Sequence, residues 1–178
     1  MAKVSIIGTG TWGIALGMVL AQNGHEVTAW SALPKEIEAI RESYTCKNLP
    51  GVEIPRSIVF TADLQEACTD KEMLVLSVPS VFTRGVAKQM NPFVKEGQLI
   101  VSVAKGIEEK TLMTMSQQIE EELPMANVAV LSGPSHAEEV SRGIPTTVVA
   151  GAKDRQTAEH IQNLLCNLSF VYIQALIS

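Results

Sequence analysis

Short apolar runs alternate along the chain with longer segments in which apolar residues recur at helical spacing. The runs Val4–Ile7, Met73–Val78 and Leu99–Val103 consist mostly of apolar residues, which is typical of strands buried on both faces of a parallel sheet. Further strands are expected at Glu26–Trp30, Ile58–Phe60, Val128–Leu131, Thr146–Ala150 and Ser169–Ile173.

The segments between these strands have helical periodicity or composition. Helices are expected at Trp12–Gln22, Lys35–Arg41, Asp63–Ala67, Phe82–Met90, Thr111–Glu122, Ala137–Ser141 and Asp154–Leu165. Gly24 should end the first of them and Asp154 should cap the last. This alternation predicts an α/β fold with a mostly parallel sheet and helices on both faces.

Composition places the chain among globular proteins. It has 178 residues, of which 46% are hydrophobic and 19% charged, so we expect one domain over residues 1–178. A net charge of −5 and 4% aromatic residues argue against a nucleic-acid partner. The three cysteines form no C-x-x-C motif, so we predict neither a disulfide framework nor a metal site, and a reducing cytoplasm fits them.

One uncharged stretch, Val4–His25, has the length of a membrane segment or signal peptide. Glycines interrupt it at five positions, which makes a continuous lipid-facing helix a poor fit. A buried strand, a glycine turn and a buried helix fit better, and we expect no membrane insertion. The five glycines are Gly8, Gly10, Gly13, Gly17 and Gly24.

The turn after the first strand carries the motif G-x-G-x-x-G. Gly8 permits a tight turn, Gly10 lets the backbone approach a pyrophosphate, and Gly13 lets the helix pack on the strand. The helix that follows offers its N-terminal N–H groups to the phosphates. In this strand–turn–helix context the motif predicts dinucleotide binding and a Rossmann-type, doubly wound sheet.

The sequence after the second strand leaves the choice between NAD and NADP open. An NAD-specific enzyme usually has Asp or Glu there to bind the ribose 2′-hydroxyl, and an NADP enzyme usually has Arg. This chain has neither directly after Trp30, and Glu36 is interpreted as a helix residue. Ser31 and Lys35 are the residues that could meet a 2′-phosphate.

Three more candidate stretches follow strands, at the sheet edge where ligands bind in open α/β folds. Phe82 either borders a cofactor or lies in the core. Lys105, between Ala104 and Gly106, is either an exposed loop residue or a cationic donor to a carbonyl or phosphate. Ser135, in the Gly133-Pro134-Ser135 turn, either caps the next helix or touches ligand. His136 lacks the partners of a hydrolase triad and is interpreted as structural.

These stretches together resemble the N-terminal half of the soluble, bacterial-type NAD(P)-dependent glycerol-3-phosphate dehydrogenases, over about residues 3–170. The resemblance is carried by IIGTGTWGIAL, NGHEVTAW, NLPGVEIP, LVLSVPSVF, VSVAKGIE and LSGPSHAEEVSRGIPTTVV. It implies an oxidoreductase with a nucleotide domain followed by a helical substrate domain. The implied reaction is hydride transfer between NAD(P)H and dihydroxyacetone phosphate, which gives sn-glycerol 3-phosphate for phospholipid synthesis.

The resemblance also assigns contact positions to residues of this chain. Lys105 is the implied catalytic residue, shared by cofactor and substrate. The implied cofactor contacts are Gly8, Gly10, Thr11, Trp12, Gly13, Phe82, Lys105 and Ala137, and the implied substrate contacts are Lys105, Gly133 and Ser135.

Two departures from the family pattern matter. Ala32-Leu33 stand where family members often carry Arg or His, which leaves NAD and NADP both open. The helical domain of the family, with its proton-transfer lysine and phosphate-binding Arg-Asn pair, is absent from the chain. We therefore expect this chain alone to bind cofactor but to be catalytically incomplete, and a homodimer is an option for the full-length enzyme. The alternatives are a related reductase of another small substrate and a non-catalytic nucleotide-binding module.

Overall fold

The computed structural model describes residues 1–133, 135–167 and 169–177. The strands are β1 Lys3–Ile7, β2 Glu26–Trp30, β3 Val59–Thr61, β4 Met73–Leu76, β5 Leu99–Ser102, β6 Asn127–Ser132, β7 Thr146–Ala152 and β8 Phe170–Leu176. The α-helices are α1 Thr11–Gln22, α2 Pro34–Ser43, α3 Leu64–Cys68, α4 Thr83–Met90, α5 Met115–Glu122, α6 Ala137–Ser141 and α7 Arg155–Leu165. Two short 3-10 helices are η1 Ser80–Phe82 and η2 Asn91–Phe93.

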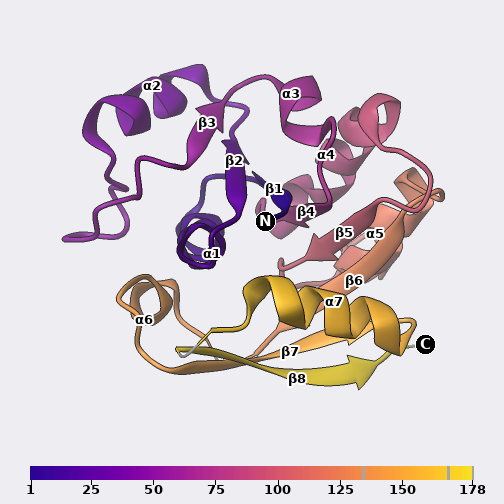
Figure 1. Ribbon diagram of the computed structural model, residues 1–178. Coiled ribbons are helices and arrows are strands. Elements are labelled where there is room, and N and C mark those ends of the chain that lie inside the picture. The colour runs from indigo at the N-terminus through magenta and orange to yellow at the C-terminus, as the bar shows by residue number, and fades with distance from the viewer. Residues whose placement is uncertain (134, 168, 178) are drawn as a thin grey trace.

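Within the described residues, all eight strands belong to one sheet in the order β3-β2-β1-β4-β5-β6-β7-β8 (Figure 1). Strands β1 to β6 are mutually parallel, β7 pairs antiparallel with β6, and β8 pairs parallel with β7. The predicted mostly parallel sheet is therefore confirmed, with a reversed pair at one end. The chain winds outward from β1 in one direction and from β4 in the other, so the strand order switches between β1 and β4.

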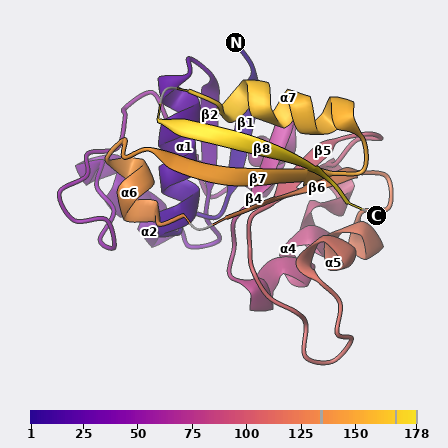
Figure 2. The same ribbon diagram turned by 90° about the horizontal axis from the view of Figure 1, so that it is seen from below.

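Side chains alternate between two apolar cores, one on each face of the sheet. Val4 and Ile6 of β1 pack in the core that contains α1, α2 and α7, whereas Ile7 packs in the core that contains α3, α4 and α5. Viewed from below, α7 lies on one side of the sheet and α4 and α5 on the other (Figure 2). Burying an isoleucine of this kind contributes about 1.5–3 kcal/mol relative to leaving it exposed.

Local chemistry explains where α1 and α7 end and begin. Gly24 has φ +82°, and its N–H and that of His25 donate to the carbonyls of Ala21 and Leu20, which is the left-handed stop predicted for α1. The Asp154 carboxylate accepts the N–H of Thr157 at 2.7 Å, which confirms Asp154 as the cap of α7.

The prediction of a helix over Thr111–Glu122 is wrong in its first turn. The Thr114 side chain accepts the N–H of Gln117, and the Gln117 side chain accepts the N–H of Thr114, so α5 begins at Met115. This reciprocal cap is stronger than the weak helical preference of the residues before it. Leu112 has φ +60°, so the chain before Thr114 turns back on itself.

The uncharged N-terminal run consists of β1, the glycine turn and the twelve-residue α1. In the part of the chain that the structure describes, no helix has both the length and the apolar character needed to cross a membrane.

Candidate cofactor and active site

The candidate residues follow strands that all point the same way, so they meet at one edge of the sheet. Gly8 follows β1, Ser77 follows β4, Lys105 lies three residues after β5, and Gly133 follows β6. Because β1 and β4 are neighbours whose connections leave in opposite directions, the crevice for a ligand lies between their carboxyl ends.

The three motif glycines meet different surroundings. A Cβ on Gly13 would lie 2.3 Å from the Gly8 carbonyl oxygen and 2.4 Å from Ser77 Oγ, so α1 packs on the strands only with glycine there. Gly8 has φ +120°, and a Cβ on it would lie 3.0 Å from the Ser77 backbone. A Cβ on Gly10 would meet no described atom within 4 Å, so this turn is open to a ligand.

The N-terminus of α1 is suited to an anion. Its N-cap is Gly10, and the three residues of its first turn, Thr11, Trp12 and Gly13, include no acidic side chain. The N–H groups and positive end of the helix dipole therefore face the open space at Gly10 without a competing carboxylate. These features fit the pyrophosphate of a dinucleotide.

A groove of about 570 Å³ runs from the glycine turn across the ends of β2 and β4. Gly8 and Gly10 line one part of it, Trp30 and Glu36 another, and Phe82 its far side. Phe82 is 59% exposed, so its interpretation as a core residue is wrong. The ring instead presents an apolar surface to whatever occupies the groove.

A second hollow, of about 280 Å³, collects the implied substrate residues. It is lined by Trp12, Lys105, Gly133 and Ser135, among others. The Lys105 ammonium donates to the Gly133 carbonyl at 2.9 Å, which fixes the cation at this hollow. The alternative in which Ser135 caps α6 is wrong, because the N-cap of α6 is His136. Pro134, the centre of the predicted turn, lies outside the described residues.

Thr11 and Ala137 lie together in a third hollow beside α6. It measures about 340 Å³ and is also lined by Asn48, His136 and Glu138. The structure thus brings Ala137 next to Thr11 at the start of α1 but not into the hollow of Lys105.

An ion-pair cluster that the sequence interpretation missed anchors the Lys105 loop. Arg84 of α4 donates to both carboxylate oxygens of Glu108 at 2.9 Å, and it also binds Glu122 at 3.0 Å and Glu121. The hydrogen bonds from Arg84 lower the pKa of Glu108 to about 2. The same hydrogen bonds to the carboxylates raise the pKa of the Arg84 guanidinium, and the bonds to Glu108 have the largest effect. One guanidinium therefore joins α4, the loop after β5 and α5.

This cluster connects the two sides of the candidate site. Glu108 lies three residues after Lys105, and Arg84 lies two residues after Phe82. A Cβ on Gly106 would lie 3.3 Å from the Ser80 Cβ, so the Lys105 loop also packs directly on η1. Because Arg84 and Glu108 are 24 residues apart in sequence, no local pattern indicates that the two side chains pair.

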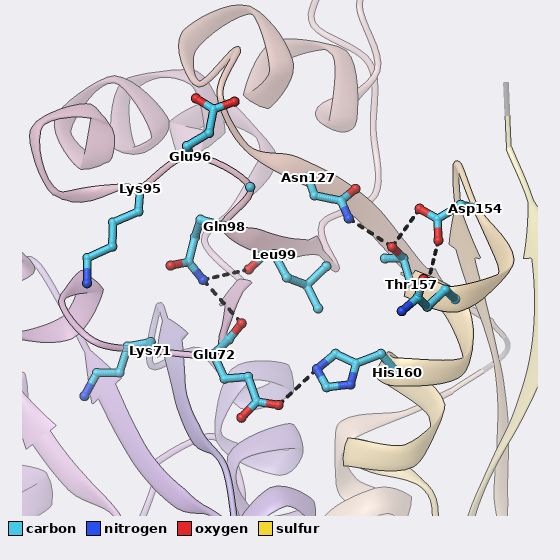
Figure 3. A pocket seen from close by; sticks show the side chains of 12 residues that line it. Lys71, Glu72, Lys95, Glu96, Gln98, Leu99, Asn127, Asp154, Thr157 and His160 are labelled. Atoms are coloured by element: carbon cyan, nitrogen blue, oxygen red, sulfur yellow. Dashed lines mark hydrogen bonds and ion pairs between the residues drawn. The ribbon is translucent and has the colours of Figure 1, made fainter.

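Another hollow of about 570 Å³ lies at the opposite edge of the sheet, near the amino ends of β4, β5 and β6 (Figure 3). Four of its polar side chains form two pairs: His160 with Glu72 at 3.0 Å, and Asn127 with Thr157 at 2.9 Å. None of the predicted site residues lines it.

Strand order, the glycine turn at the switch point and the open N-terminus of α1 define a dinucleotide-binding domain of the Rossmann type. The chain belongs to the glycerol-3-phosphate dehydrogenase family. A family model described as "NAD-dependent glycerol-3-phosphate dehydrogenase N-terminus" matches residues 3–158, so the resemblance found in the sequence is confirmed.

Curated relatives agree with this assignment. The chain is 57% identical over 171 residues to a glycerol-3-phosphate dehydrogenase [NAD(P)+] of Agathobacter rectalis, covering 96% of this chain and 51% of the relative. It is 49% identical over 173 residues to the enzyme of that name from Fusobacterium nucleatum, covering 96% of this chain and 52% of the relative. The chain thus spans about half the length of the curated relatives it matches.

Solved structures show the same fold. A glycerol-3-phosphate dehydrogenase of Coxiella burnetii superposes with a TM-score of 0.91 at 26% identity, over 97% of this chain and 53% of that one. A UDP-glucose dehydrogenase of Pyrobaculum islandicum superposes with a TM-score of 0.77 at 19% identity, over 98% of this chain and 46% of that one. The second likeness shows the fold alone.

Proposed function

We propose that residues 1–178 are the NAD(P)-binding domain of an enzyme that transfers hydride between NAD(P)H and dihydroxyacetone phosphate, giving sn-glycerol 3-phosphate. The observation that supports this most is the Lys105 ammonium, held at a hollow beside the glycine turn. In this proposal the other half of the relatives' length carries a helical substrate domain. The whole enzyme acts in the cytoplasm, and a homodimer is its proposed assembly.

The cofactor side of the site follows from the groove. The N-terminus of α1 and the open space at Gly10 would hold the pyrophosphate, and Phe82 would border the cofactor. When bound, the reduced nicotinamide supplies the hydride. Trp12, two residues after Gly10 of the groove, lines the Lys105 hollow, so it would contact the cofactor from the substrate side.

Lys105 would act on the substrate carbonyl. An ammonium carries three protons, and one of them is used by the Gly133 carbonyl, so others remain for a substrate oxygen. As hydride adds to C2, the carbonyl π electrons move to oxygen, and a cationic donor there stabilises the developing charge. One such donor contributes about 2–4 kcal/mol to transition-state stabilisation. Gly133 and Ser135 would form the wall against which the substrate rests.

The first test uses the chain itself. NADH fluorescence titration should detect binding, and an NADH-oxidation assay with dihydroxyacetone phosphate should give negligible turnover, because the proposed proton-transfer lysine and phosphate-binding pair belong to the other domain. Robust turnover by the 178-residue chain would refute the catalytic incompleteness. Absence of NAD(P)H binding would refute the cofactor role.

The second test concerns Lys105 in a full-length protein that carries this domain. Lys105→Ala should lower kcat/KM by orders of magnitude while the melting temperature stays near that of the parent, since Lys105 is an exposed loop residue. Lys110→Ala, in the same loop, is the matched control and should leave the kinetics unchanged. Equal kinetics for the two variants would return Lys105 to the role of a surface lysine. Cofactor binding without any reduction of dihydroxyacetone phosphate by the full-length protein would favour a non-catalytic module.

A further inference from the structure

The end of β2 holds an acidic side chain at the groove wall. Ser31, the first residue after β2, donates from its hydroxyl to Glu36 Oε2 at 2.6 Å. The Leu33 N–H donates in turn to Ser31 Oγ at 3.2 Å. These two bonds fold the start of α2 back onto the strand end. Glu36 therefore lines the same groove as Gly8 and Gly10, although it is six residues past Trp30.

The charge that lines the groove is negative. Among the described residues that line it, Glu36 is the one charged side chain, and none is lysine or arginine. Of the nearby cations, Lys35 is exposed and does not line the groove, and Arg41 donates from Nε to the Phe60 carbonyl at 3.0 Å. The Ser31 hydroxyl, which could meet a 2′-phosphate, already donates to Glu36.

We propose that Glu36, oriented by Ser31, selects NAD(H) over NADP(H). The inference rests on the proposed function in that the groove binds a dinucleotide with its adenosine ribose near the end of β2. A carboxylate there accepts a hydrogen bond from the ribose 2′-hydroxyl. A 2′-phosphate in the same place would meet a negative charge and no neutralising cation.

Hydrogen bonds to a charged group and unpaired like charges each change an equilibrium by roughly 10- to 100-fold. We therefore expect the 178-residue chain to bind NADH at least about tenfold more tightly than NADPH. Glu36→Gln should bring the two affinities close together, mainly by improving the binding of NADPH. Ser31→Ala leaves the carboxylate but removes its support, so it should give an intermediate ratio.

The experiment is a fluorescence titration of the chain and its variants with NADH and with NADPH at one fixed salt concentration. Glu38→Gln is the matched control, since it removes the same charge from an exposed position of α2 that does not line the groove. It should leave the NADH-to-NADPH ratio unchanged.

Three outcomes of this titration test the role of Glu36. A native preference for NADH that Glu36→Gln abolishes and Glu38→Gln preserves supports the proposal. Equal binding of the two nucleotides by the native chain, or a preference that Glu36→Gln leaves intact, refutes the selectivity while the cofactor role stands. Failure of both nucleotides to bind refutes the cofactor role itself, and this inference with it.

Discussion

Adding one methyl group to Gly13 should damage folding, whereas adding it to Gly10 should damage cofactor binding. A Cβ at Gly13 would lie 2.3 Å from the Gly8 carbonyl oxygen and 2.4 Å from Ser77 Oγ. That hydroxyl already donates to the Gly8 carbonyl at 2.8 Å. The first contact is with backbone, so no side-chain rotation relieves it, and α1 must move away from β1.

Two opposing contributions set the change in folding stability for Gly13→Ala. Overpacking of this kind costs about 1–3 kcal/mol, and the contact with a backbone atom favours the upper end. Alanine is the better helix former, which stabilises the folded state by about 1 kcal/mol. The net loss is then about 2 kcal/mol, which lowers the melting temperature by roughly 4–8 °C in a domain of this size.

Gly10→Ala should behave differently. Gly10 has φ −62° and ψ 168°, which alanine adopts without strain, and no described atom lies within 4 Å of the added methyl. Stability should fall by roughly 0.5–1 kcal/mol, because glycine is the better N-cap. The methyl would occupy the space proposed for the pyrophosphate, so NADH affinity should fall by roughly 10- to 100-fold.

Thermal melting by circular dichroism and NADH titration of both variants separate the two effects. The expected result is a large melting shift for Gly13→Ala, and a small shift with a large affinity loss for Gly10→Ala. If Gly13→Ala melted with the parent, or Gly10→Ala bound NADH as the parent does, the assignment of one glycine to packing and the other to ligand approach would be wrong.

Three further predictions concern ionisable and capping groups. The pKa of Glu108 is lowered from 4.5 to about 2 by Arg84, so its stabilising contribution is complete above pH 4.5 and is lost as the pH falls towards 2; melting curves over that interval should be less pH-dependent for Glu108→Gln. Asp154→Ala removes the cap of α7 and should cost about 1 kcal/mol, measured by urea unfolding. Burial raises the pKa of the Cys68 thiol to about 12, so a thiol reagent at pH 8 should leave it unmodified while it labels the exposed Cys166.

Much of the fold was accessible from the sequence because the strong local signals agree with the tertiary structure. The strand Glu26–Trp30 and the helix Ala137–Ser141 have the predicted bounds, and the sheet is mostly parallel. The prediction for the first turn of α5 is wrong because a cap formed by two particular side chains sets where the helix begins. Periodicity does not contain such pair contacts.

The candidate site likewise contains residues that the sequence indicates and residues that it does not. The glycine motif and the stretches after β4, β5 and β6 were found because each has a local signature at a strand end. The partners of Arg84 lie 24 to 38 residues away in sequence, and no pattern along the chain reports such a contact. Glu36 has no signature at the strand end for a related reason: it lies six residues past Trp30, and a side-chain hydrogen bond from Ser31 brings it back to the groove.

The switch between β1 and β4 has a consequence for how the protein is made. The glycine turn is completed by Ser77, which contacts it from 69 residues further along the chain. Ribosomes add about 5–20 residues per second, so roughly 3–14 s pass between the synthesis of β1 and that of β4, which closes the groove. Closing so long a loop is costly in entropy, whereas β7, α7 and β8 are neighbours in sequence. Dinucleotide binding by a nascent chain should therefore report the arrival of β4, and NADH fluorescence could time that step of folding.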